Sequence, residues 1–233
     1  MFRADADDLA ALRVLYDACG GTGWSKQWLV DAEVLASTNY PGVTFSPEGR
    51  VTAINIAGYG LTGELPGEGF SLPELTTLTL NNNAITGLTA GINLPKLTTI
   101  DLTSNSIAGL TEGVSLPELT TLNLNNNHVS ELLTSGFNMP KLATLNLSNN
   151  RLKGELPTES LDLPALTTLN LSRNSLTGNV PASLLKECTL LKNLDLSHNQ
   201  LTEVKTALPT SITSLNLNNQ HRVYGSSTGL HDL

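Results

Sequence analysis

The chain has 233 residues and a formal net charge of −8, with 13 Lys and Arg against 21 Asp and Glu. Its basic residues are scattered along the sequence, without the dense basic pattern of proteins that bind nucleic acid. No apolar run approaches the roughly 18 residues that are needed to span a bilayer. We therefore expect no nucleic-acid partner and no membrane insertion.

The first 50 residues differ in composition from those that follow, and they contain both tryptophans, Trp24 and Trp28. Apolar residues recur at helical spacing between Asp5, a suitable N-cap, and the Gly20-Gly21 pair, which favours a helix end. This pattern predicts one amphipathic helix. Because the first strand of a stacked repeat array exposes an unpaired edge, we interpret this segment as an N-terminal cap with the tryptophans in its core.

A unit of the form Leu-x-x-Leu-x-Leu-x-x-Asn-x-(Leu/Ile/Val) recurs every 21 to 25 residues after this segment. The alternation of apolar and polar residues in its first half predicts a short strand whose leucines face the core. Units of this length stack on one another to bury a continuous core, so we expect eight parallel strands in one sheet. The first positions of the eight units are Val51, Leu75, Leu97, Leu119, Leu142, Leu166, Leu191 and Ile212.

The asparagine of each unit follows the predicted strand at the point where the chain turns inward. Its amide both donates and accepts hydrogen bonds, so it can satisfy backbone groups that the turn leaves unpaired. We predict an internal ladder of these amides with a structural role. Its members are Asn83, Asn105, Asn127, Asn150, Asn174 and Asn199, while Tyr59 and Gln220 hold the same position in the first and last units.

These repeats resemble the leucine-rich repeat family. The segments LTGELP, LKGELP and LTGNVP are similar to the L-x-G-x-(L/I/V)-P units of its extracellular plant type, and they occur among 22-residue units. The stretch DDLAALRVLYDACGGTGW resembles the cap of secreted and cell-surface members. Thr38 and Phe45 replace the two cysteines of the plant pattern and Tyr40 replaces its tryptophan, so a bacterial or protist surface protein is favoured over a plant receptor.

The resemblance implies an α/β fold, namely a right-handed leucine-rich repeat solenoid with a curved parallel β-sheet on the concave face and a helical N-terminal cap. We expect the cap over residues 1–50, eight repeats over residues 51–222 and a polar tail over residues 223–233. The resemblance also implies a non-catalytic binding module, secreted or at the cell surface, that recognises a protein or glycan through the concave face. No signal sequence is visible in the acidic start of the chain, so a cytoplasmic location stays open, and we expect a monomer.

The outward positions of the concave sheet form three columns, because equivalent residues on neighbouring strands lie about 4.8 Å apart. They are mainly threonine and asparagine, with almost none of the aromatic and arginine side chains that anchor protein interfaces. One interpretation of this pattern is a solvated face that binds no ligand, since threonine is simply a good strand former. Two others are a surface that binds a glycan, and a structural or surface-recognition role such as ice binding on the threonine rows. The central ligand candidates are Thr121, Thr144, Thr168, Asn146 and Asn170.

The most varied chemistry of this face, with both basic and acidic side chains, occurs near its C-terminal end. These side chains are Arg173, Lys192, Asp195 and His198. A solvated charged patch is the simpler interpretation. We nevertheless place a specific contact here, with Arg173 as a planar anion-binding fork and Lys192 as a point charge.

Two asparagines of the same face, Asn146 and Asn170, begin Asn-x-Ser triplets that match the N-glycosylation pattern. Glycans at these positions would cover the predicted binding face. Either the protein never meets a eukaryotic glycosylation machinery, which we favour, or the concave face is not the site.

Catalysis requires titratable groups that converge in a dry pocket. The four histidines fall in separate units or in the tail, and no nucleophile is placed to use His198 beside Asp195, so we do not expect an enzyme. No cluster of ligands indicates a metal or another cofactor. Cys19 and Cys188 should lie more than five strand spacings apart, beyond the disulfide limit of about 7 Å between Cα atoms, so we expect two free, buried thiols.

Overall fold

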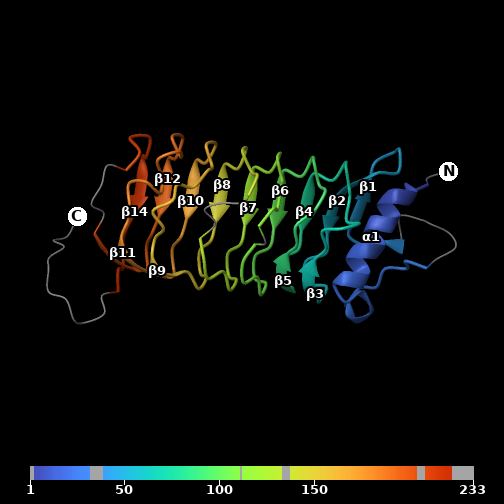
Figure 1. Ribbon diagram of the computed structural model, residues 1–233. Helices are drawn as coiled ribbons and strands as arrows, with labels where there is room; N and C mark the ends of the chain where they lie inside the picture. Colours follow the sequence, from blue (N-terminus) through green and yellow to red (C-terminus); the bar gives the residue numbers. More distant parts are fainter. Residues whose placement is uncertain (1–2, 32–38, 111, 133–136, 204–207, 222–233) are drawn as a thin grey trace.

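The computed structural model of the chain describes residues 3–31, 39–110, 112–132, 137–203 and 208–221. These residues form an elongated solenoid of stacked coils, with one helix at the N-terminal end (Figure 1). Thr38 and the predicted tail over residues 223–233 lie outside the described residues. The boundaries of cap and repeats at residues 50 and 222 stay predictions.

The main sheet has nine strands in the order β1-β2-β4-β6-β7-β8-β10-β12-β14. Strand β1 (Val43–Phe45) pairs antiparallel with β2, and the later neighbours all pair in parallel. The eight parallel strands are β2 (Val51–Asn55), β4 (Thr77–Thr79), β6 (Thr99–Asp101), β7 (Thr121–Asn123), β8 (Thr144–Asn146), β10 (Thr168–Asn170), β12 (Asn193–Asp195) and β14 (Ser214–Asn216). Each begins at, or two residues after, a predicted first position, so the expected parallel sheet is confirmed.

Short strands also form where the chain returns from the main sheet. β3 (Thr62–Leu65) pairs with β5 (Ala84–Leu88), and β11 (Ser175–Asn179) lies between β9 (Lys153–Glu155) and β13 (Gln200–Glu203). Several of these strands carry the Leu-x-Gly segments that the sequence singled out. They are parallel as well, because successive coils of a solenoid follow the same path.

The predicted ladder of asparagine amides joins the coils. The amide nitrogen of Asn105 donates to the carbonyls of Leu80 and Leu102, both at 3.0 Å, and its oxygen accepts the Ile85 amide at 3.0 Å. The other five asparagines make the equivalent bonds. Gln220 continues the ladder in the last unit, whereas the Tyr59 hydroxyl donates to the Pro41 carbonyl of the cap.

The cap consists of α1 (Ala6–Ala18), the single 3-10 turn η1 (Gly21–Gly23) and β1. Asp5 caps α1 as predicted, because its carboxylate accepts the backbone amides of the first helical turn. Trp24 and Trp28 are buried against each other, with ring centroids 4.9 Å apart in an edge-to-face arrangement. Their indole N–H groups donate to the carbonyls of Cys19 and Pro41, so both tryptophans belong to the cap core.

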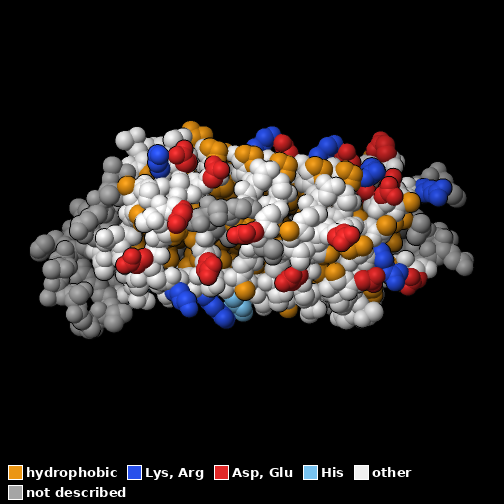
Figure 2. All heavy atoms as spheres, viewed as in Figure 1, with side chains coloured by type: hydrophobic (Ala, Val, Ile, Leu, Met, Phe, Trp, Pro, Cys, Tyr) orange, Lys and Arg blue, Asp and Glu red, His pale blue; other side chains and the backbone are white. Residues whose placement is uncertain are grey.

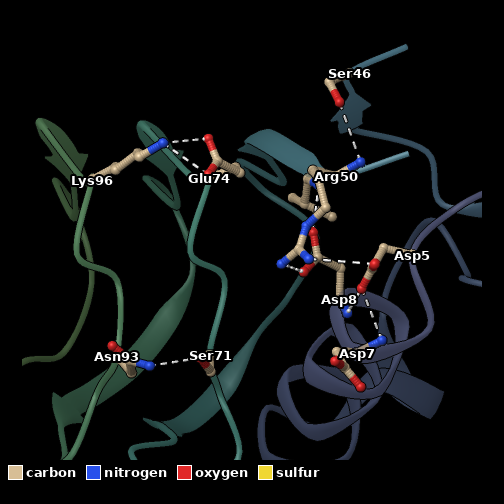
Figure 3. Close-up of polar contacts among 10 residues, drawn as sticks. Asp5, Asp7, Asp8, Ser46, Arg50, Ser71, Glu74, Asn93 and Lys96 are labelled. Atoms are coloured by element: carbon tan, nitrogen blue, oxygen red, sulfur yellow. Dashed lines mark hydrogen bonds and ion pairs between the residues drawn. The ribbon is translucent and has the colours of Figure 1, made fainter. Parts of the chain in front are cut away.

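A buried carboxylate connects the helix to the first parallel strand. Asp8 is fully buried, and its two oxygens accept the Val51 amide and the Arg50 guanidinium, each at 2.6 Å (Figure 3). Arg50 also lies 3.3 Å from the Asp5 carboxylate. Burial raises the pKa of the Asp8 carboxyl, while the Val51 amide and Arg50 act in the opposite direction. The start of β2 is therefore held to the cap by a charge that has no access to water.

Both cysteines are free and buried, as expected, one in the cap and the other before β12. Burial raises the pKa of the Cys19 thiol to about 12 and that of the Cys188 thiol to about 11. Neither thiol therefore has the thiolate character of a reactive cysteine.

We predict that Asp8→Ala lowers the free energy of unfolding by about 2–3 kcal/mol, because it leaves the Val51 amide and the Arg50 charge without their main partner. Chemical denaturation followed by tryptophan fluorescence measures this loss. The control is Asp7→Ala, which removes an exposed carboxylate from the same helical turn and should cost less than about 1 kcal/mol. Equal losses in the two variants would contradict the role given to Asp8.

Candidate functional site

The register of the main sheet aligns the outward residues into the predicted columns. Its central column is Ala53, Thr77, Thr99, Thr121, Thr144, Thr168, Asn193 and Ser214. A second column lies one residue earlier in each unit, and a third column ends each strand. We call these three columns together the sheet face. They differ in how much of their polar chemistry is available to a ligand.

The column one residue before the central one is largely committed to the fold. The hydroxyls of Thr76, Thr98 and Thr120 each donate to the carbonyl at the same position of the preceding coil, at 3.0 to 3.1 Å. Thr167 and Thr213 do the same with the carbonyls of Ala143 and Lys192. These hydroxyls link neighbouring strands and have their donor proton in use.

The column at the strand ends is also structural. The side-chain oxygen of each Asp or Asn in it accepts the backbone amide two residues later, which is the hydrogen bond of an Asx turn. The residues that do so are Asn55, Asp101, Asn123, Asn146, Asn170, Asp195 and Asn216. Asn146 and Asn170, predicted as ligand candidates, therefore engage their side-chain oxygen in the turn and retain mainly their side-chain N–H groups for a partner.

The central column retains free hydroxyls. Within the described part of the chain, the side chains of Thr77, Thr99, Thr121 and Thr144 have no hydrogen-bond partner, and Thr168 accepts only the Asn193 amide at 3.3 Å. All five are partly exposed. Of the three polar columns that the sequence predicted, only the central one thus has available hydroxyls, one in each of these five coils.

The four charged candidates do not form one cluster. Arg173 and His198 lie in equivalent turns of adjacent coils, and the Arg173 amide donates to the carbonyl of Ser197 at 2.9 Å. Lys192 precedes β12, whereas Asp195 ends it, so Lys192 lies at the other end of the strand from His198. Asp195 is occupied by the Ser197 amide. The structure therefore brings Arg173 and His198 together and places Lys192 apart from them.

Arg173 adopts a backbone conformation that arginine disfavours. Its φ angle is 55°, in the left-handed region, and that of His198 is 54°, although histidine enters this region more readily. The equivalent position in the other units is glycine in the first unit, serine in one and asparagine in four, and glycine and asparagine tolerate this conformation. Sequence analysis missed this feature, although the recurring Asn-Asn pairs at the ends of the units were a signal for it. A costly residue choice at a turn is typical of a functional position.

His221 joins His198 at the same end of the solenoid, which the sequence did not predict. Their ring centroids are 6.2 Å apart, and Nε2 of His198 lies 3.2 Å from the Asn219 amide nitrogen. Among the described residues, no group of three or more His, Cys, Asp or Glu side chains is placed to hold a metal ion. In the same part of the chain, no helix has both the length and the apolar character needed to cross a membrane.

The sequence patterns of leucine-rich repeats match residues 73–112, 117–176 and 190–215. No curated protein matches the chain. Parallel strands, buried leucines and the amide ladder define a solenoid of this class, and the matched repeats identify its family. The chain belongs to the leucine-rich repeat family.

Solved structures with the same fold come from plants and bacteria. The plant peptide hormone receptor RGFR1, in complex with RGF2, is 32% identical over 72% of this chain and 28% of its own, with a TM-score of 0.54. YopM from Yersinia enterocolitica is 30% identical over 75% of this chain and 34% of its own, with a TM-score of 0.53. This chain thus spans about a third of the length of these relatives. The fold and these neighbours support a binding or recognition role.

A plant ice-binding protein also has this fold. It is 23% identical to the chain, covers 93% of it and 80% of its own length, and has a TM-score of 0.61. At this identity, the likeness concerns the fold alone.

We predict that Arg173→Asn raises the free energy of unfolding by about 0.5–1 kcal/mol, because asparagine tolerates the left-handed conformation better than arginine does. Thermal or chemical denaturation measures the gain. Arg151→Asn, in the neighbouring coil, is the control because Arg151 is not among the residues with positive φ. A lower stability of Arg173→Asn than of wild type would show that the arginine side chain contributes to the fold.

Proposed function

We propose that the chain is a non-catalytic binding module, secreted or displayed at a cell surface, that recognises a protein or glycan through the sheet face. The observation that carries this proposal is the contrast within the fold. Most polar side chains of the two outer columns of the sheet face are used in structural hydrogen bonds, whereas most hydroxyls of the central threonine column and the side chains of Arg173 and Lys192 have no such partner within the described residues. These remaining groups are the ones that a partner can use.

The related structures lend support to a protein partner. RGFR1, the relative with 32% identity, is a plant peptide hormone receptor whose structure was solved in complex with RGF2. The C-terminal units of this chain offer a place for such a contact. Arg173 and Lys192 are exposed there, and neither forms an ion pair within the described residues. Each is thus free to meet an anionic group of the partner.

We expect the double variant Arg173→Gln, Lys192→Gln to bind its partner on the order of tenfold more weakly than wild type, because two charge contacts are lost. A glycan array and a pull-down, followed by titration of whatever binds, measure the change. The matched control is Lys96→Gln, Lys141→Gln, which removes the same charge from lysines that pair with Glu74 and Glu118 before other strands. Equal affinity of the charged-end variant and wild type would rule out this placement.

The threonine column favours a second candidate function, recognition of an ordered surface such as ice. Its five threonines are in strict register from β4 to β10 and keep their hydroxyls available, so the same group recurs at one strand spacing of about 4.8 Å. A periodic solid surface can match a repeat of this kind, whereas a protein partner has no need of it.

This second function predicts that the wild-type protein shows thermal hysteresis and that Thr121→Lys, Thr144→Lys abolishes it, because long charged side chains would hold an ice surface away from the row. Measurement of the freezing-point gap in a nanolitre osmometer tests it. Ser130→Lys, an exposed residue beyond the sheet face, serves as the control. Absence of hysteresis in wild type would leave the discrete-partner function as the only candidate.

A further inference from the structure

Five basic or imidazole side chains from different units flank the ladder: three directly follow a ladder residue, and two, Arg173 and His198, directly precede one. Each is the immediate neighbour of a ladder amide, and because that amide points into the core, the residues on either side of it face outward. We call these five residues the basic edge. They are His128, Arg151, Arg173, His198 and His221.

The basic edge crosses five adjacent coils. The Arg151 amide donates to the carbonyl of Val129, the residue after His128, and the Arg173 amide donates to the residue before His198. The His221 amide in turn donates to Asn199, the residue after His198. With one coil every 4.8 Å or so, the edge extends over about 19 Å. Figure 2 shows a small group of basic and His side chains on the lower border of the molecule, with Asp and Glu side chains on the face above it.

The basic edge contrasts with the charge of the whole chain, which carries 21 acidic residues and a net charge of −8. Of the sixteen residues that flank the eight ladder positions, two per unit, none is acidic. Neither arginine of the edge forms an ion pair within the described residues, while Arg13, Arg50, Lys96 and Lys141 all do. The positive charge of the edge is therefore available to an external anion.

Among the described residues, no acidic side chain forms an ion pair with the edge. The Asp195 carboxylate lies at the end of β12 and accepts the Ser197 amide. Glu131 and Glu155 line a shallow hollow of about 250 Å³ together with Lys153. Arg173 also occupies a left-handed turn that arginine disfavours.

We propose that the basic edge binds an acidic polysaccharide that carries one carboxylate per sugar, laid along the solenoid from coil to coil. The edge offers one cationic or protonatable side chain per coil, a low and regular charge density that such a chain matches. The guanidinium groups of Arg151 and Arg173 are suited to bidentate pairing with carboxylates. Their uncharged neighbours are amides and hydroxyls, such as Asn149 and Ser175, which suit sugar hydroxyls.

A protein partner fits the edge less well. Its flanking positions hold no aromatic or large apolar residue, and such residues are the usual anchors of protein interfaces. This inference rests on the proposed binding function and shares Arg173 with it. It moves the contact from the sheet face to the turns that follow the strands and names the class of ligand.

The test is titration of the full chain with alginate, a polymer of uronic acids, at low ionic strength. The propylene glycol ester of alginate is the matched uncharged probe. We expect wild type to bind alginate and not the ester, and to lose affinity as salt rises. The variant Arg151→Gln, Arg173→Asn should bind alginate about tenfold more weakly, because two exposed charge contacts are removed.

Two controls separate this inference from the proposed function. Lys96→Gln, Lys141→Gln removes the same charge elsewhere, and Lys192→Gln alters the sheet face alone, so each should stay within about twofold of wild type for alginate. Unchanged affinity of the edge variant, or no binding of alginate by wild type, would overturn the basic edge as a polysaccharide site. Stronger binding of poly-glutamate or of dextran sulfate than of alginate at equal charge would overturn the ligand class. A loss with Lys192→Gln alone would support the sheet face and reject the edge.

Discussion

The whole architecture depends on one repeated contact, the inward-facing carboxamide that joins each coil to the one before it. A planar amide offers two donor hydrogens and an acceptor oxygen, so one residue can satisfy a carbonyl of its own coil together with a carbonyl and an N–H group of the preceding coil. This arrangement resolves the main difficulty of a narrow solenoid, which must turn its backbone inward without water to hydrogen-bond it. Gln220 makes the same contacts with a longer side chain, which indicates that the hydrogen-bond pattern matters more than the residue type.

Fixing the coils in register also determines what the outside of the molecule can offer. Equivalent residues align into columns, and a column acts as a unit, since a hydroxyl that donates to the preceding coil does so in most coils. The threonines before the central column and the carboxamides at the strand ends are used in this way. The side chains that remain available to a partner are therefore those that the backbone does not use, namely the central threonines and the residues beside the ladder.

The spacing of leucine and asparagine was sufficient to predict the parallel sheet and the ladder, and the helical spacing of apolar residues together with the two tryptophans predicted the buried cap, because these features depend on which residues face inward. Three features of the site could not be predicted in this way. The use of the Thr98 hydroxyl depends on its orientation toward a neighbouring coil, and the turn at Arg173 depends on its φ angle. Basic residues that are scattered in the sequence, such as Arg151 and His221, come to lie along one edge of the molecule only when the coils are stacked. Spacing along a chain gives periodicity, whereas these features require the three-dimensional path of the backbone.

Each ladder side chain faces the interior, whereas the side chains of the residues directly before and after it face the solvent. A point mutation next to Asn174 or Asn199 can therefore alter the outer surface without changing a ladder side chain. Duplication of a coil would likewise lengthen the edge by one more side chain. A solenoid of this kind can vary its outer surface by small genetic steps, while the side chains that join its coils stay the same.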